Sequence, residues 1–316
     1  MTFQKILCPV DFSLGSQQAM LLAIRLANEA AAELVLAHVW YVPPLVYAEE
    51  PPFPADTLQA MIDDERRGLA AAAAEASRLG ARSVTTKFLM GVPWAELVEM
   101  LQGDAAFGLV VMGTHGRTGL DRVLLGSVAE KVVRHAPCPV LTVPARGQVS
   151  EFRRVLCPVD FSESSRRAVA LAAELVAGGG SGITLLHSIE VPVSYSGEPR
   201  VEGFAEALDK RGTDLLEDWA RDLRTRVSVP VTTRSRIGSP GAQILAILDD
   251  DRIFDLVVMG SHGRTGLRRA LLGSVAEKVV RHAGCPVVVA RTRPGDQAVV
   301  TDSQPRAAAA DVACTD

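Results

Sequence analysis

The sequence has little of what marks membrane proteins and nucleic-acid-binding proteins. It contains no run of about 18 consecutive apolar residues, so no membrane-spanning helix is predicted. Its 316 residues include 33 basic and 37 acidic residues, a formal net charge of -4. A nucleic-acid-binding surface usually shows as a basic excess, so no nucleic-acid partner is expected. Aromatic residues are scarce as well, at 5%.

Cysteine is also rare. The five cysteines are an odd number and lie far apart in a long chain, which does not fit a disulfide framework. The first residues, MTFQKILCPVDFS, pass directly into a strand-like pattern. They lack the charged head, long apolar run and cleavage site of a secretory signal. A reducing, cytoplasmic location is therefore expected.

Two common phosphate-binding motifs are missing too. No GxxxxGK[ST] loop is present, and no GxGxxG follows the first apolar run, which excludes a Walker-type NTPase and the dinucleotide-binding fingerprint. The chain has instead two related glycine-rich segments, GTHGRTGLDRVLLGS at residues 113–127 and GSHGRTGLRRALLGS at residues 260–274. Each of them leads into an apolar pattern with helical spacing.

These segments belong to a duplication of the whole chain. KILCPVDFS at residues 5–13 matches RVLCPVDFS at residues 154–162, and residues 113–143 share 24 of 31 positions with residues 260–290. A period near 150 residues is the size of a domain and too long for a solenoid repeat. We therefore expect domains at residues 1–147 and 151–292, followed by a disordered tail at 293–316 that has no apolar period.

Each repeat alternates short apolar strands with helical patterns. Strands joined by crossover helices pair in parallel, and strands that are apolar throughout need helices on both faces. The predicted fold class is therefore α/β, with two tandem doubly wound, Rossmann-like domains. In such sheets ligands bind beyond the carboxyl ends of strands, where the strand order reverses. That rule points to Asp11, Asp160 and the two glycine-rich segments.

The glycine-rich segments have a physical interpretation. Gly113 and Gly116 allow a left-handed backbone and close approach to a ligand, although turns alone also need glycine. Gly126 and Ser127 lead into a helix whose first amides lack intrahelical partners and attract anions. Ser127 and Glu130 also fit a capping box, and both roles of Ser127 stay open here.

The spacing G-x2-G-x9-G-[ST], with the CPVDFS openings and the HAPCPV and HAGCPV endings, resembles the ATP-binding branch of the universal stress protein family. The resemblance covers residues 2–144 and 152–291. It implies a five-stranded parallel sheet of order 3-2-1-4-5 in each domain. It also implies that the fifth strands of the two repeats pair in an intramolecular pseudo-dimer, which leaves no exposed edge there. A homodimer of whole chains stays open.

The family's ATP site transfers position by position to the first repeat. The Asp11 carboxylate would accept hydrogen bonds from the nucleoside, Val39 would offer backbone atoms to the adenine, and the loop amides would surround the triphosphate. The implied positions are Pro9, Val10, Asp11, Val39, Met112, Gly113, His115, Gly116, Gly126, Ser127 and Val128.

The second repeat supplies a matching set with one departure from the family: Ser188 replaces the apolar residue Val39, which would weaken packing on the adenine. The first repeat departs at Gly108, where Asp255 of the second repeat is closer to the acidic residue usual in the family. We expect this difference to affect the start of a strand and not the ligand. The implied positions are Pro158, Val159, Asp160, Ser188, Met259, Gly260, His262, Gly263, Gly273, Ser274 and Val275.

Other polar residues have plainer explanations. Arg117 and Arg264 suit either phosphate contact or solvated loop charge. His135 with Cys138, like the matching pair in the second repeat, lacks the second ligand pair of a tetrahedral metal site, so helix-end charge and core packing are preferred and no metal site is predicted. His38 is expected to be structural.

The sequence therefore predicts a regulatory ATP-binding protein of the stress response with one adenine-nucleotide site per domain. No spaced acid/base pair is found, so no catalytic residue is assigned. Two alternatives stay open. One is a slow ATPase or phosphotransfer enzyme that uses Asp11 and Asp160 with Mg²⁺ on the phosphates. The other is a protein-interaction module with a structural nucleotide.

Overall fold

The structure is a computed structural model that describes residues 3–41, 54–114, 116, 125–145, 152–176, 182–190, 199–263 and 272–291. Several sequence predictions fall outside these ranges. They concern His115, Arg117, Arg264 and the expected disordered tail.

The first half of the chain alternates strands and helices as the sequence pattern predicts. The apolar runs become strands, and Pro93 occupies the first turn of its helix, where its missing N–H costs nothing. The elements are β1 (Lys5–Pro9), α1 (Leu14–Ala30), β2 (Glu33–Trp40), α2 (Ala55–Arg78), β3 (Val84–Met90), α3 (Pro93–Gly103), β4 (Phe107–Gly113), α4 (Ser127–His135) and β5 (Val140–Val143).

The second half repeats this order. Pro240 begins its helix as Pro93 does. The elements are β6 (Arg154–Pro158), α5 (Glu163–Val176), β7 (Gly182–Ile189), α6 (Pro199–Arg224), β8 (Val231–Ile237), α7 (Pro240–Asp251), β9 (Leu256–Gly260), α8 (Ser274–His282) and β10 (Val287–Ala290).

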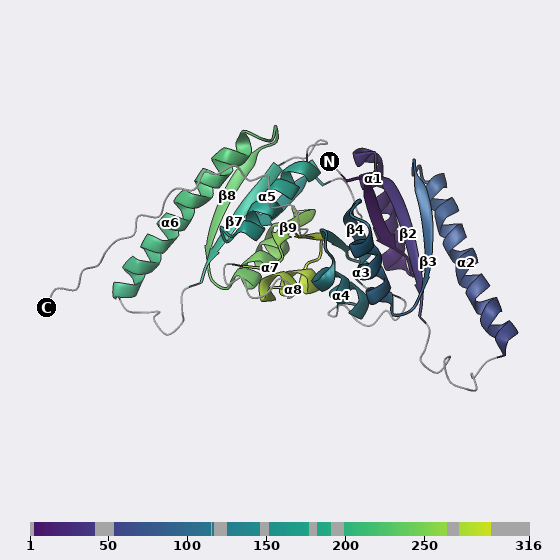
Figure 1. The fold of residues 1–316 in the computed structure, drawn as a ribbon. Coiled ribbons are helices and arrows are strands. Elements are labelled where there is room, and N and C mark those ends of the chain that lie inside the picture. Colours follow the sequence, from purple (N-terminus) through teal and green to yellow (C-terminus); the bar gives the residue numbers. More distant parts are fainter. Residues whose placement is uncertain are drawn as a thin grey trace.

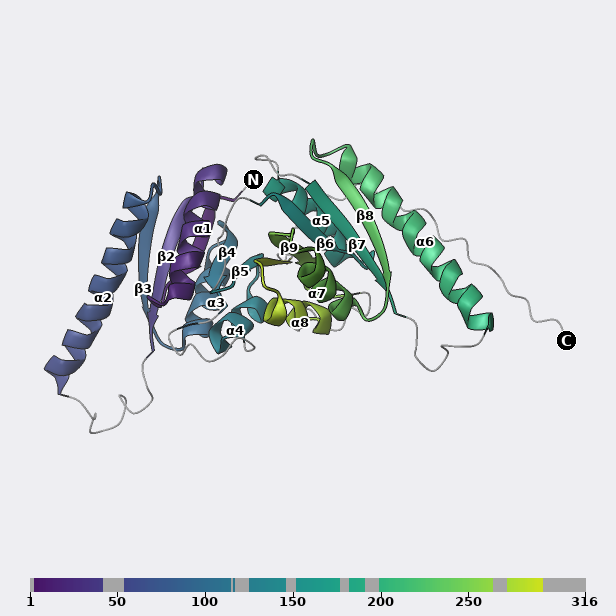
Figure 2. The same cartoon turned by 180° about the vertical axis from the view of Figure 1, so that it is seen from behind.

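All ten strands form one sheet in the order β3-β2-β1-β4-β5-β10-β9-β6-β7-β8 (Figures 1 and 2). Within each half the neighbouring strands are parallel, and counted within its own half each sheet runs 3-2-1-4-5. The order reverses between β1 and β4 and between β6 and β9. The α/β class with two tandem doubly wound halves is confirmed.

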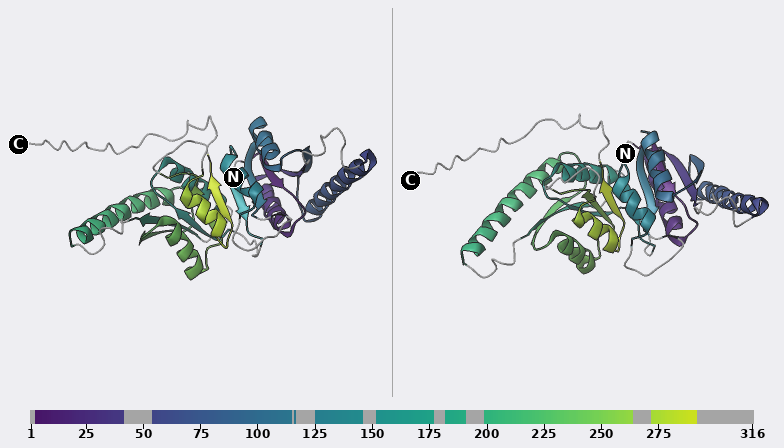
Figure 3. Two further views of the ribbon diagram at one scale, coloured as in Figure 1. Left: turned by 90° about the horizontal axis from the view of Figure 1, so that it is seen from below. Right: turned by 60° about the horizontal axis from the view of Figure 1, so that its bottom comes forward.

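Helices cover both faces of this sheet, as the two views of Figure 3 show. One hydrophobic core lies between the sheet and α1, α2, α5 and α6, and a second core lies under α3, α4, α7 and α8. Neighbouring strand residues alternate between the two: Ile6 and Cys8 belong to the first core, and Leu7 belongs to the second. The long helices α2 and α6 lie at opposite ends of the molecule, beside the edge strands β3 and β8 (Figure 1).

The two halves join at β5 and β10, which pair antiparallel, with Thr142 opposite Val287. The Thr142 hydroxyl also donates to the Val287 carbonyl oxygen at 3.1 Å. These are the fifth strands of the two repeats, so the pairing is the one that the family resemblance implies. It closes an edge that would otherwise offer unpaired backbone groups.

Charged side chains of α4 and α8 meet across the same junction. Arg134 lies 3.1 Å from Glu130 of its own helix and 3.7 Å from Glu277 of the other. Arg281 repeats the arrangement, at 3.1 Å from Glu277 and 3.9 Å from Glu130. These four half-buried side chains form a symmetric ring that reinforces the strand pairing.

No helix in the described parts of the chain combines the length and apolar character needed to cross a bilayer.

Candidate functional site

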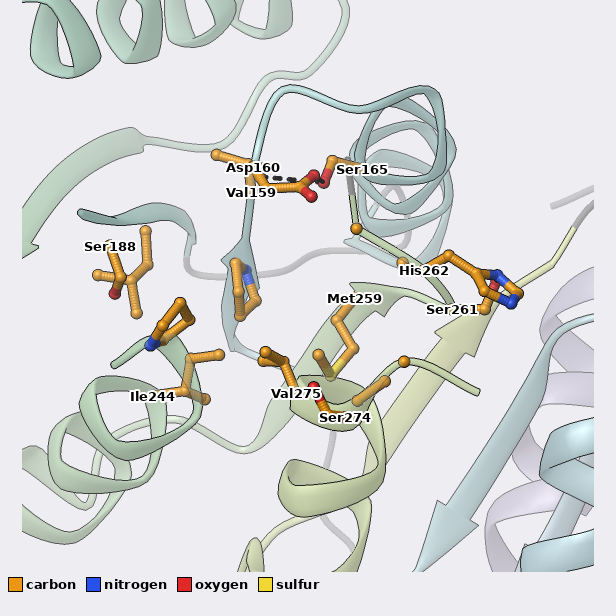
Figure 4. A pocket seen from close by; sticks show the side chains of 17 residues that line it. Val159, Asp160, Ser165, Ser188, Ile244, Met259, Ser261, His262, Ser274 and Val275 are labelled. Carbon is orange, nitrogen blue, oxygen red and sulfur yellow. Dashed lines mark hydrogen bonds between the residues drawn. The ribbon is translucent and has the colours of Figure 1, made fainter. Parts of the chain in front are cut away.

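A cavity of about 260 Å³ opens at the carboxyl ends of β6 and β9, where the strand order of the second half reverses (Figure 4). It is the location that the switch-point rule predicts. The residues that line it are Pro158, Val159, Asp160, Ser165, Leu186, Ser188, Pro240, Ile244, Met259, Gly260, Ser261, His262, Gly263, Gly273, Ser274, Val275 and Ala276. All eleven positions predicted from the second repeat are among them, while their role in binding stays a prediction.

Asp160 stands at the top of this cavity in the view of Figure 4. Phe161, the next residue, has φ of 64°, a left-handed conformation that is unusual for a bulky side chain and turns the chain sharply after β6. The Asp160 Oδ1 atom accepts hydrogen bonds from the Ser162 amide at 3.1 Å, the Ser162 hydroxyl at 2.5 Å and the Ser165 hydroxyl at 2.5 Å. The carboxylate is therefore fixed in orientation by the start of α5.

The second carboxylate oxygen faces the glycine-rich loop. A Cβ atom placed on Gly263 would lie 2.9 Å from Asp160 Oδ2, and one on Gly116 would lie 2.6 Å from Asp11 Oδ2. Only glycine lets the loop pass so close to the carboxylate. The structure thus brings together the aspartate and the second loop glycine of each repeat, two groups separated by about a hundred residues in sequence.

Asp11 is held in the same way in the first half. Its Oδ1 atom accepts from the Ser13 amide at 3.1 Å and the Ser13 hydroxyl at 2.6 Å. Ser13 also caps α1, because its hydroxyl oxygen accepts from the Ser16 amide. Phe12 repeats the left-handed turn, with φ of 66°.

Gly113 does not have the left-handed backbone that was expected there, while its role in ligand binding stays a prediction. Among the described glycines, φ is positive at Gly80, Gly91, Gly182 and Gly238, so the left-handed backbone expected at Gly113 is wrong. The close approach at Gly113 is to the protein itself: an added Cβ would lie 2.8 Å from the Gly15 carbonyl carbon. Gly113 therefore lets the end of β4 pack against the first turn of α1.

The capping box predicted at Ser127 is also wrong. Gly126 is the N-cap of α4 and no side chain caps the helix, so Ser127 is the first helical residue. The reason is the bond from the Gly126 amide to the Thr114 carbonyl oxygen at 2.7 Å, which holds Gly126 outside the helix. Glu130 pairs with Arg134 instead of reaching back.

The second half has the same helix start. Gly273 is the N-cap of α8, without a side-chain cap, and its amide donates to the Ser261 carbonyl oxygen at 2.8 Å. The first three helical residues, Ser274, Val275 and Ala276, all line the cavity. Amides at these positions have no intrahelical partner and lie at the positive end of the helix dipole. They are suited to bind an anion.

Two buried histidines fix the strand ends beside the aspartates. The Nδ1 atom of His38 lies 2.7 Å from the Val10 carbonyl oxygen, and that of His187 lies 2.8 Å from the Val159 carbonyl oxygen. Since a carbonyl oxygen only accepts, Nδ1 carries the proton in both. The predicted structural role of His38 is confirmed.

His262 lines the cavity, but its ring points away from it (Figure 4). Its Nδ1 atom lies 2.9 Å from the Ser261 hydroxyl. Burial lowers the pKa of His262, and the nearby Arg291 lowers it further. Because the ring is turned aside, the backbone of His262 is the part of this residue that faces the cavity.

His135 lies in the last turn of α4, as predicted, but its surroundings disfavour the charged form of its ring. Burial lowers its pKa, with further lowering by Arg134, Arg291 and Lys131. Its ring lies 5.6 Å from that of Trp94. Cys138 is buried in the core, as predicted. No group of three or more potential metal ligands occurs within the ranges that the structure describes.

The remaining positions of the first repeat take corresponding places. Pro9 ends β1, Val39 lies near the end of β2, and Met112 is buried near the end of β4. Gly126 precedes α4, and Val128 is half-buried in its first turn.

Sequence reasoning missed some of the cavity wall. Ser165 holds Asp160, and Pro240 and Ile244 bring the first turns of α7 to the cavity. The proline at the helix start followed by an apolar residue four positions on was a usable signal, since both lie on one helix face.

Fold and cavity together define a tandem doubly wound α/β protein with its candidate site at the sheet's switch point. The model of the universal stress protein family matches residues 2–144 and again residues 151–291. The chain belongs to the universal stress protein family.

Individual relatives agree with this assignment. A universal stress protein of Mycobacterium tuberculosis is 32% identical over 291 residues, which cover 89% of this chain and 95% of the relative. One of Mycolicibacterium smegmatis is 29% identical over 292 residues, with 91% and 97% covered. The crystal structure of a universal stress protein from Archaeoglobus fulgidus shares the fold, with a TM-score of 0.66, 21% identity, and 92% and 99% covered.

Proposed function

We propose that each half of this chain binds one adenine nucleotide, ATP, and that the protein is a regulatory nucleotide-binding protein of the stress response. The observation that carries the proposal is the uncapped start of α8, whose first three residues face a cavity with the Asp160 carboxylate on its wall. Amides suit the phosphates. A carboxylate suits the hydroxyl groups of a ribose, which donate to it.

The rest of the cavity wall fits a nucleoside. Val159, Met259 and Ile244 line it with apolar surface, against which a flat base can pack. The first half has the same helix start at Gly126 and the same aspartate–glycine approach between Asp11 and Gly116. We therefore assign one site to each of the proposed domains, residues 1–147 and 151–292.

Mg²⁺ commonly accompanies bound ATP through the phosphates and one or two carboxylates. Asp11 and Asp160 are the carboxylates that would lie near such an ion. Their Oδ1 atoms are engaged by serine groups, and their Oδ2 atoms face the loop glycines. The two side chains would help to orient the metal-bound phosphates.

The side chains that line the cavity favour ATP binding without rapid ATP hydrolysis. Among the described residues that line it, the side chains able to transfer a proton near neutral pH are Asp160 and His262. The His262 ring points away, so no acid/base pair faces the cavity (Figure 4). We expect ATP hydrolysis slower than about 1 s⁻¹, and a faster rate would favour the ATPase alternative.

The test is to denature the purified protein and to identify and count the released nucleotide by mass. Wild-type protein is expected to release ATP. Gly263→Ala places a methyl group 2.9 Å from Asp160 Oδ2 and displaces the carboxylate, so the second site should lose its nucleotide. Gly116→Ala should empty the first site in the same way.

Gly284→Ala is the matched control. Nothing lies within 4 Å of a Cβ atom at Gly284, between α8 and β10, so this variant should retain all nucleotide. Full occupancy of the Gly116→Ala/Gly263→Ala double variant would show that the aspartate–glycine approach does not form the site.

A further inference from the structure

The two candidate sites differ at one matched wall position. Val39 lies one residue before the end of β2, and Ser188 lies one residue before the end of β7. Val39 is half-buried and packs against the apolar core. Ser188 replaces that apolar contact with a hydroxyl group, at the wall of the second cavity.

The Ser188 hydroxyl is buried and lacks a partner. Its Oγ atom makes no hydrogen bond and is almost completely shielded from solvent. Buried hydroxyl groups are nearly always hydrogen-bonded, because an unmade bond destabilises the structure. An unpaired hydroxyl on a cavity wall therefore indicates a partner that the cavity's ligand supplies.

The position of Ser188 indicates which part of the ligand is concerned. Figure 4 shows Ser188 beside Ile244 at one end of the cavity, with Ser261 and His262 at the other end. The glycine-rich loop and the helix start that suit phosphate lie on the side of Ser261. Ser188 thus faces the part of an extended nucleotide that is farthest from its phosphates, which is the base.

We propose that Ser188 is a specificity-determining residue of the second site, and that its hydroxyl group hydrogen-bonds the polar edge of the bound base. This inference rests on the proposed nucleotide binding. The hydroxyl can donate and accept, so it can pair with either an amino group or a ring nitrogen of adenine. A change of the single χ1 torsion re-aims Oγ without moving the backbone.

The consequence is that the two sites are not equivalent. The first site meets the base with Val39, whose side chain offers only apolar contact. The second site adds a hydrogen bond from the Ser188 side chain. Leu186 and Ile244, two other described residues of the cavity wall, are apolar and cannot supply it.

The experiment compares Ser188→Val with Ser188→Thr. Valine and threonine have nearly the same shape, so the pair isolates the hydroxyl group. Both are made in an Asp11→Ala background, which silences the first site, and thermal unfolding confirms that each variant is folded. Calorimetry on nucleotide-free protein then measures the dissociation constants of ATP and of inorganic tripolyphosphate, which has no base.

We expect Ser188→Val to weaken ATP binding about tenfold, the factor that one hydrogen bond of typical strength gives. Ser188→Thr should stay within about twofold of the background protein, and tripolyphosphate should bind all three alike. Equal ATP affinity of the two variants would overturn the assignment of Ser188 alone. Absence of ATP binding in wild-type protein would instead remove the proposed function.

Discussion

In the first half, His38 lies between two acceptors, with Nδ1 at the Val10 carbonyl oxygen and Nε2 3.2 Å from the Glu65 carboxylate. In the second half, His187 makes the same bond to the strand end, but Gly212 takes the place of Glu65: a Cβ atom on Gly212 would lie 3.0 Å from the His187 ring. The strand end beside the aspartate is thus held identically, while the outer support of the histidine differs.

One more support differs between the two halves. Asp255 accepts hydrogen bonds from the Arg153 and Arg154 amides at the start of β6, as expected from its position. The first half has Gly108 there, where an added Cβ would lie 2.7 Å from the Phe3 ring. One half fixes its first strand by a carboxylate and the other by an aromatic ring.

The aspartate, the loop glycine and the helix start of each candidate site do not follow this divergence. Both halves have an aspartate held by a serine hydroxyl, a glycine against its second oxygen, and a helix that starts without a side-chain cap. The comparison teaches that the candidate site depends on a small local set of groups. The surrounding scaffold can reach the same geometry in different ways.

The largest expected effect is at the glycines that end β4 and β9. Gly113→Val and Gly260→Val place Cβ atoms 2.8 Å from the Gly15 carbonyl carbon and 2.9 Å from the Ser164 carbonyl carbon. Since backbone must move, each should lower the free energy of unfolding by about 3 kcal/mol or more. Urea denaturation measures this free energy. If only one of the two variants lowered the unfolding midpoint, the two halves would not be equivalent at this position. Gly284→Ala should change the free energy of unfolding by less than about 0.5 kcal/mol.

A smaller effect is expected at Arg291, which exists in one half only. Its Nη2 atom donates to the carbonyl oxygens of Val133 and Arg134 at 2.5 Å, at the end of α4 in the other half. The matching residue of the first half is Pro144, which cannot make such bonds. Arg291→Ala should lower the free energy of unfolding by about 2 kcal/mol, the value of hydrogen bonds from a charged group.

The control for Arg291 is Arg226→Ala, which breaks an exposed ion pair with Asp222 at 2.8 Å. Exposed pairs stabilise little, so this change should stay below about 1 kcal/mol. Equal effects of the two substitutions would show that Arg291 does not brace the junction.

The smallest effect is a dependence on pH. Burial lowers the pKa of His262 and of His135 below 6.5 in the folded protein. A depressed pKa means that the unfolded chain binds protons more readily, so stability is present above pH 6.5 and falls as the pH falls through the folded-state values. The loss should be below about 1 kcal/mol per histidine, because both groups keep substantial solvent contact.

This dependence is measurable as the shift of the unfolding midpoint between pH 7.5 and pH 5. His262→Gln and His135→Gln should each reduce the shift. A shift that survives both His135→Gln and His262→Gln would assign the dependence to other groups.

The strands and helices were predictable because their signals are local. The predicted alternation of apolar strands and helical patterns was confirmed, as at β1, and a proline at the start of a helix, as at Pro93, is a signal of the same local kind. The internal repeat then predicted two candidate sites, because each glycine-rich segment follows a strand at which the strand order reverses, where the switch-point rule expects a ligand. All predicted positions of the second repeat lie on one cavity for this reason.

The errors concern contacts that no local pattern records. The missing cap at Ser127 depends on the Thr114 carbonyl, and the glycine requirement at Gly113 depends on the first turn of α1. The pKa of His135 is lowered first by burial and then by Arg134 and Arg291, and Arg291 lies 156 positions further along the chain. The Thr114 carbonyl, the first turn of α1 and Arg291 come near only after the sheet has formed.

The most direct measurement is calorimetric titration of ATP into full-length protein stripped of nucleotide, with Gly116→Ala, Gly263→Ala and Gly284→Ala in parallel. The account predicts two ATP per wild-type chain and per Gly284→Ala chain, and one per chain for either loop variant. No heat at millimolar ATP in correctly folded wild-type protein would contradict it.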